Sequence, residues 1–222
     1  MMKVISLGLG VQSTAMYILS SLNKIERADY AVFADPGAEL PRTYEILELL
    51  QDWAKYNNGI PIHITTEKNL YKDIVNKSNS RGARWASIPA FTENGGMIRR
   101  QCTGEYKIEP VIQKIRQLHG LKKHKHLPKT QVWLGISLDE IQRMKTSILP
   151  RIDYYYPLIE SRMSRSDCIK VFEERAFPVP PKSSCVFCPY HSDKNWKDIK
   201  EKQDLGIKEI LKYGVNYIKH SH

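Results

Sequence analysis

The 222-residue chain lacks any apolar run long enough to span a bilayer, and glycine interrupts its start too early for a secretory signal. It also lacks internal repeats and low-complexity segments, which argues against a repeat architecture. Only four cysteines are present. We therefore expect a cytoplasmic protein with no membrane partner, whose thiols stay out of structural disulfides. The length fits one α/β domain with an appendage.

The formal net charge is +10, and lysine dominates Lys122–Lys129 and Lys194–Lys212. A positive field of this size favours polyanionic partners such as nucleic acid. A solvated basic surface explains the net charge equally well.

Apolar segments alternate with segments of helical spacing before residue 150. The predicted strands are Lys3–Leu7, Tyr30–Ala34, Ile60–Thr65 and Gln131–Gly135. The predicted helices are Val11–Leu22, Pro41–Tyr56, Leu70–Asn76 and Ile108–Leu118, with a helical turn over Leu138–Met144. This alternation predicts an α/β fold with a doubly wound parallel sheet, whose ligand lies at the carboxyl ends of its strands.

After Pro150 the pattern changes, so we expect a nucleotide-binding domain over 1–150 and a C-terminal extension over 151–222, packed on the core. The segments expected in the extension are a short strand or extended piece at Tyr154–Pro157, a helix over Ser164–Arg175, a proline-rich stretch over Phe177–Pro189 and a final helix over Asp193–Tyr213. Within the first 150 residues, Ser78–Gln101 is expected to be irregular because of its glycines and proline.

A glycine loop follows the first predicted strand, and its candidate ligand-binding residues are Ser6, Gly8, Gly10, Gln12, Ser13 and Thr14. Glycine lets the backbone approach a ligand closely, and the helix N-terminus offers free N–H groups to an anion. The loop lacks the Gly-Lys-Ser/Thr of a Walker loop and the third glycine of the dinucleotide fingerprint. Phosphate binding and a tight packing turn both remain open on the pattern alone.

The second candidate site is built from Cys185 and Cys188, two residues apart, with Cys102 and Cys168 elsewhere in the chain. Four thiolates suit tetrahedral Zn²⁺ or a [4Fe–4S] cluster, whereas a lone Cys-x-x-Cys can also be a redox dithiol. Cys168 lies on an amphipathic segment and could be an ordinary buried cysteine. His191 is a substitute ligand or, as we expect, a surface histidine.

Cys102 follows Arg99 and Arg100 and precedes Lys107. Nearby cations lower the pKa of a thiol, so this setting is expected to favour the thiolate of Cys102.

Several blocks resemble the phosphoadenosine phosphosulfate reductase family of the adenine nucleotide alpha-hydrolase, or PP-loop, superfamily, in its phage and DNA-phosphorothioation branch. The glycine loop is similar to Ser-Gly-Gly-x-Asp-Ser, with Gly8, Gly10 and Ser13 matching and Gln12 in place of the aspartate. The other similar blocks lie at residues 33–44, 99–110, 134–143 and 182–189. The resemblance runs from residue 3 to about residue 192, in the family's order.

The resemblance implies that ATP or a related adenine nucleotide binds the glycine loop by its phosphates. Asp35 would lie near the ribose or adenine, and Gly135, Asp139 and Arg143 would close the site. Gln12 removes a charge beside the phosphates, so the use of Mg²⁺ is open. Relatives that use a cubane cluster favour [4Fe–4S] over zinc, with Cys102, Cys168, Cys185 and Cys188 as its ligands.

The function that the resemblance implies first is ATP-dependent sulfur transfer, by adenylation with release of pyrophosphate. Lys107, Arg143 and Arg100 would be the catalytic cations. The expected partners are tRNA or DNA and a sulfur donor such as a cysteine desulfurase, and the chain could form a homodimer. The alternatives are sulfonucleotide reduction, disfavoured because no cysteine follows Cys188, and a non-catalytic nucleotide- and metal-dependent binding module.

Overall fold

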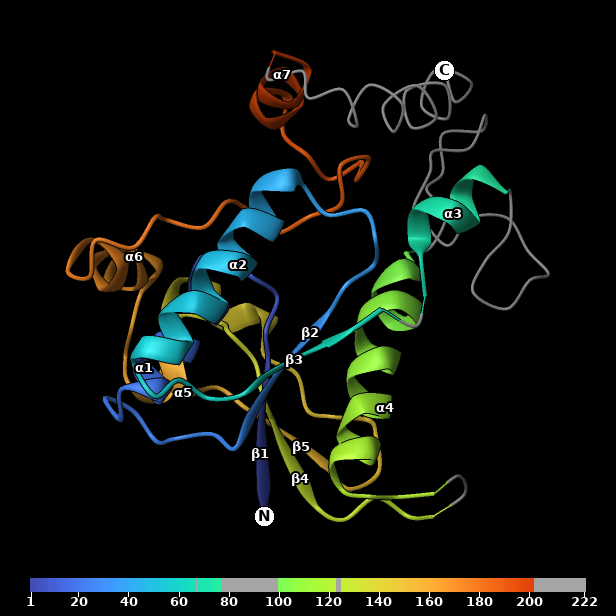
Figure 1. Ribbon diagram of the computed structural model, residues 1–222, viewed down its shortest axis with the longest axis vertical. Coiled ribbons are helices and arrows are strands. Elements are labelled where there is room, and N and C mark those ends of the chain that lie inside the picture. The colour runs from blue at the N-terminus through green and yellow to red at the C-terminus, as the bar shows by residue number, and fades with distance from the viewer. Residues whose placement is uncertain (67, 77–99, 123–124, 202–222) are drawn as a thin grey trace. The chain divides into compact units, whose positions relative to one another are not determined.

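The computed structural model describes residues 1–66, 68–76, 100–122 and 125–201 (Figure 1). The chain divides into two compact units, each assembled from separate segments. The first unit comprises Met1–Ala34, Pro41–Thr65 and Val111–Ser183. The second comprises Asp35–Leu40, Thr66–Pro110 and Ser184–His222.

The first unit contains one sheet of five strands in the order β3-β2-β1-β4-β5. The strands are β1 (Met2–Ser6), β2 (Tyr30–Ala34), β3 (Ile62–Thr65), β4 (Thr130–Trp133) and β5 (Ile152–Tyr155). All four neighbouring pairs are parallel, which confirms the predicted α/β fold. Because β5 pairs with β4, the boundary expected at residue 150 does not separate the two units.

Helices cover both faces of this sheet. On one face lie α1 (Val11–Ser21), α2 (Pro41–Tyr56) and α6 (Arg165–Glu173), and on the other lies α4 (Glu109–Leu118) (Figure 1). Successive strand residues point to opposite faces, so Ile5 belongs to the first core and its neighbour Val4 to the second. The sheet is therefore doubly wound, as expected.

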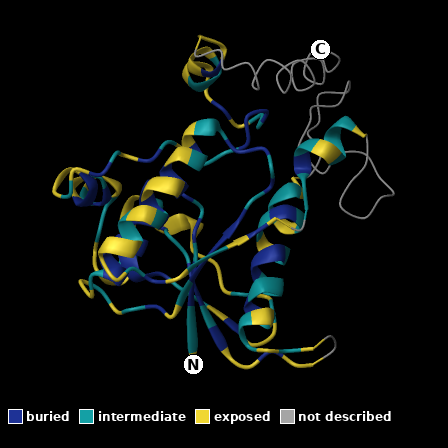
Figure 2. Cartoon of the chain, in the orientation of Figure 1, coloured by how far each residue is buried: buried dark blue, intermediate teal, exposed yellow. Residues whose placement is uncertain are grey.

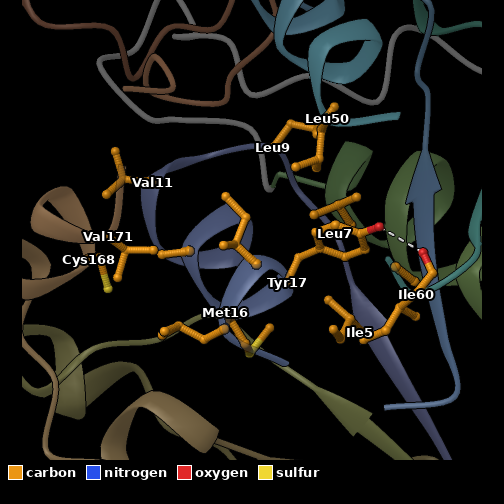
Figure 3. Packing of buried hydrophobic residues seen from close by; sticks show 14 of the residues in the cluster. Ile5, Leu7, Leu9, Val11, Met16, Tyr17, Leu50, Ile60, Cys168 and Val171 are labelled. Carbon is orange, nitrogen blue, oxygen red and sulfur yellow. Dashed lines mark hydrogen bonds between the residues drawn. The ribbon is translucent and has the colours of Figure 1, made fainter. Parts of the chain in front are cut away.

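Helix α1 is buried along its whole length, and Figure 2 shows it in the interior behind α2. Its Tyr17 hydroxyl donates to the carbonyl oxygen of Ile60 at 2.7 Å, which gives the buried phenol a partner (Figure 3). Leu7 and Leu9, on either side of Gly8, are buried in the same core. The glycine loop is thus anchored by its own apolar residues.

The remaining elements are short. They are α3 (Leu70–Val75), the π-helix η1 (Gly104–Ile108), the 3₁₀-helix η2 (Leu138–Arg143), α5 (Pro157–Glu160) and α7 (Asp193–Glu201). The predicted final helix is described only to Glu201, and most of the stretch expected to be irregular lies outside the described residues. No helix in the described segments is long and apolar enough to cross a membrane.

The second unit has its own small apolar core. Its buried members are Ala38, Leu70, Tyr106, Cys185, Val186 and Phe187. The Val186 N–H donates to the Ala38 carbonyl oxygen at 2.9 Å, and Glu39 forms an antiparallel bridge with Cys185. The Tyr106 hydroxyl donates to Asp73 at 2.6 Å. Segments far apart in the chain are thereby joined around the cysteines.

Candidate functional site

The glycine loop, residues 7–10, connects β1 to α1 in the middle of the sheet. The chain passes outward from β1 to β2 and β3, whereas β4 and β5 lie on the other side of β1. The strand order therefore reverses between β1 and β4. In open α/β sheets the ligand binds at this reversal, outside the carboxyl ends of the strands.

The loop after β4 touches the start of α1 through Gly135. A Cβ atom at Gly135 would lie 2.6 Å from the Ser13 backbone nitrogen and 2.7 Å from its Cα. Real Cβ atoms do not approach backbone so closely, so this contact requires glycine. The predicted residues Gly135 and Ser13 are thus brought together by backbone packing.

Helix α1 begins without a side-chain cap. Gly10 is its N-cap residue, and the first turn contains no acidic residue. The first N–H groups of a helix have no intrahelical partner, and its N-terminus carries partial positive charge. The Ser13 hydroxyl lies within the first turn, where it donates to the Gly10 carbonyl oxygen at 3.3 Å. This end of α1 is suited to an anion such as a phosphate.

Gln12 is almost completely buried, and protein groups occupy both ends of its amide. Its Nε2 donates to Glu140 Oε2 at 3.1 Å, and its Oε1 accepts from an Arg165 NH1 at 3.1 Å. Glu140 also accepts from Arg143 at 2.7 Å. The predicted residues Gln12 and Arg143 therefore belong to one network, together with two residues that had been assigned no role, Glu140 and Arg165.

Asp139 caps α6. Its Oδ1 accepts from the Arg165 backbone N–H at 2.8 Å. Burial opposes the carboxylate, but hydrogen bonds from Arg165 and Ser137 outweigh it and hold the pKa of Asp139 below its usual value. This contact ties η2 to α6.

The other residues that were predicted to bind the nucleotide lie in both units. Ser6 is the last residue of β1 and is half-buried, and Gly8 lies in the loop next to Ser13. Thr14 is fully buried, and among the described residues its hydroxyl has no partner. Asp35 belongs to the second unit, where its carboxylate accepts from the Gly37 N–H at 2.7 Å.

Three of the four cysteines gather in the second unit. Cys185 is buried in its core, and Cys102 and Cys188 pack against that core. The Cys188 N–H donates to the Cys185 carbonyl oxygen at 3.0 Å, which forms a tight turn. All four cysteines are free thiols. Among the described residues, no group of three histidine, cysteine or acidic side chains lies close enough together to hold a metal ion.

Burial raises the pKa of two thiols in this cluster. It raises the pKa of Cys102 even though Arg100 and Lys107 act to lower it. The expectation that these cations make Cys102 a thiolate is therefore wrong for the metal-free chain. Burial, together with the Glu39 carboxylate, also raises the pKa of Cys185. A metal bound here would have to displace thiol protons.

The predicted catalytic cations are held differently. Lys107 Nζ lies 2.6 Å from Oε1 of Glu39, whose side chain is fully buried. Burial disfavours the ammonium, but Glu39 and then Cys185 outweigh it and raise the pKa of Lys107. Arg100 lies over the ring of Tyr190, with its guanidinium carbon 5.4 Å from the ring centroid. Arg99 lies outside the described residues.

Cys168 belongs to the first unit. It is fully buried on α6, within the same core as Val11 and Val171 (Figure 3). Burial, followed by the charges of Asp139 and Asp167, raises the pKa of its thiol to about 12. These surroundings are those of an ordinary core cysteine, and its role as a fourth ligand stays a prediction.

The expectation of a surface histidine at 191 is wrong. His191 is 7% exposed, its Nε2–H donates to the Cys185 carbonyl oxygen at 2.8 Å, and its ring packs edge-on against Trp196. The ring supports the turn that carries Cys185 and Cys188.

No protein-family model and no curated protein matches the chain. Among solved structures, phosphoadenylyl-sulfate (PAPS) reductase from Candida auris, in a phosphate complex, matches with 15% identity over 81% of this chain and 74% of that one, at a TM-score of 0.49. The U34-tRNA thiolase NcsA from Methanococcus maripaludis, with its [4Fe-4S] cluster, matches with 14% identity over 99% of this chain and 71% of that one, also at 0.49. Similarity this distant carries no functional conclusion.

Proposed function

We propose that this chain is an enzyme that binds ATP at the glycine loop and uses it to activate an acceptor for sulfur transfer. The observation that carries the proposal is the uncapped N-terminus of α1, packed against Gly135 where the strand order reverses. A parallel sheet binds its ligand at this position, and an uncapped helix end favours phosphate.

In the proposed reaction, an oxygen of the acceptor attacks the α-phosphorus of ATP, and the bond to the β-phosphate oxygen breaks to release pyrophosphate. A sulfur nucleophile then attacks the activated carbon, and AMP leaves with the oxygen. The α1 N–H groups and the Ser13 hydroxyl stabilise the charge that develops on the phosphates. The chain's main contribution is to hold the acceptor and the α-phosphate in line.

We further propose that Cys102, Cys185 and Cys188 hold a [4Fe–4S] cluster, with zinc as the alternative. The donor set fits either group, because three free thiols share one small core. When bound, a cluster supplies a site for the transferred sulfur. Cys168 is a fourth candidate ligand in the other unit.

Nucleic acid, as tRNA or DNA, is the proposed acceptor. The net charge of +10 favours it. A cavity of about 430 Å³ along β5 is lined by residues that include Lys145 and Tyr154, a cation and an aromatic residue of the kinds that bind an unpaired base. The sulfur donor and the homodimer stay predictions, as does any use of Mg²⁺.

Pyrophosphate release from ATP, measured with and without tRNA or DNA, tests the proposal. We expect release that depends on the acceptor and is abolished by Ser13→Ala but not by Ser161→Ala, a matched exposed serine of the same unit. Release of sulfite from a sulfonucleotide, with no pyrophosphate from ATP, would instead identify a reductase. ATP binding without either product would identify a binding module.

A further inference from the structure

The Arg165 guanidinium is held by a neutral partner. Its NH1 donates to the Gln12 amide oxygen, and no carboxylate lies within ion-pair distance of the guanidinium among the described residues. Arg143 differs, because Glu140 pairs with it directly at 2.7 Å. A carboxylate cancels the charge that it orients, whereas an amide orients the charge and leaves it in place.

Arg165 is exposed, and the nearby carboxylate of Asp139 accepts from its backbone N–H. Arg165 is the first residue of α6, where the helix dipole disfavours a cation. A guanidinium has five N–H donors, and the contact to Gln12 uses one of them. The remaining donors, which pair with no carboxylate among the described residues, lie beside the first turn of α1, where Gln12 is the second residue.

We propose that Arg165 binds the terminal phosphates of the nucleotide and that Gln12 positions it. This inference rests on the proposed nucleotide site and names a further residue of it. It also gives a reason for the amide at position 12, because a carboxylate there would neutralise Arg165 and repel the phosphates.

Binding of ATP and of AMP to the full chain, measured by calorimetry, tests the inference. We expect Arg165→Gln to weaken ATP at least about tenfold, since a charge-assisted phosphate contact is lost, and to leave AMP within about twofold. The matched control is Arg162→Gln, an exposed arginine in the turn just before α6, which should leave both affinities unchanged. Arg165→Lys should recover part of the ATP affinity.

A second variant addresses Gln12 without changing its size. We expect Gln12→Glu to weaken ATP more than AMP, at an unchanged melting temperature. If Arg165→Gln and Gln12→Glu bind ATP as tightly as the wild type does, the inference is overturned and the nucleotide site stands. If the wild type binds no ATP, both the proposed function and the inference are overturned.

Discussion

The glycine loop and the cysteine cluster differ in how completely the chain builds them. The loop is fixed by backbone contacts, such as that of Gly135 with Ser13, before any ligand arrives. In the cysteine cluster Cys185 is buried and Cys102 and Cys188 are partly buried, and burial raises the pKa of Cys102 and Cys185. A preorganised site loses little entropy on binding. A metal site of the kind proposed for the cysteines would have to lose thiol protons and bring its side chains together as the metal binds.

The largest expected effect is a loss of bound iron, and it should differ between the cysteines of the two units. We expect Cys185→Ser to remove nearly all bound iron from anaerobically purified protein, because it deletes a buried ligand of the second unit. Cys168→Ala should keep the iron and lose only about 1 kcal/mol of unfolding free energy, typical of a core substitution. Iron and sulfide analysis with a melting curve measures both. Iron loss in Cys168→Ala would instead support a four-thiolate set.

Gly135→Ala should have the next largest effect, because its Cβ would meet backbone at 2.6 Å. We expect a loss of about 1–3 kcal/mol in stability and at least tenfold weaker ATP binding. Thermal unfolding and calorimetry measure these quantities. Gly104→Ala is the control, since nothing lies within 4 Å of its added Cβ. Equal behaviour of the two variants would contradict a loop built by close packing.

The two sites should also differ in their dependence on pH. Because burial raises the pKa of Cys102 and Cys185, a metal that binds them has to displace their protons. For each proton displaced, the metal affinity increases by up to about tenfold when the pH rises by one unit. Zn²⁺ affinity should therefore increase from pH 7 to pH 8 by roughly a hundredfold for two thiols. ATP affinity should change by less than about threefold. Competition with a chelator, at each pH, is the measurement.

Asp139→Asn should have the smallest effect. The lowered pKa of Asp139 means that its carboxylate stabilises the fold above its unfolded pKa, and that this contribution is lost as the pH falls through the folded pKa. We expect a cost below about 1 kcal/mol at pH 7 that shrinks as the pH falls below the usual pKa of an aspartate, with ATP affinity nearly unchanged. Denaturant unfolding at pH 7 and at a pH below that pKa measures it. A tenfold loss of ATP affinity would make Asp139 a ligand.

Local patterns were enough to predict most of the sheet. Short apolar runs predicted four of its strands, most clearly β2, which is buried along nearly its whole length. The glycines of the loop were also predicted from their position after a strand, whereas Gly135 was predicted from the family resemblance. Such features depend on neighbours in the chain, which the sequence displays directly.

Long-range pairings could not be predicted in this way. Arg165 reaches Gln12 across 153 positions, and Glu39 reaches Lys107 across 68. The sequence around Arg165 or Glu39 does not indicate which distant side chain each of them contacts. The burial of His191 and the interleaving of two units likewise depend on tertiary contacts alone.

The interleaving has a consequence for biosynthesis. The chain crosses between units five times, after Ala34, Leu40, Thr65, Pro110 and Ser183. Cys102 is therefore synthesised long before Cys185 and Cys188, and the second unit cannot close until residues beyond Ser183 have left the ribosome. Units fold in the order in which their segments emerge. A ribosome paused before that point would carry a nascent chain with its sheet complete and its three clustered cysteines not yet together.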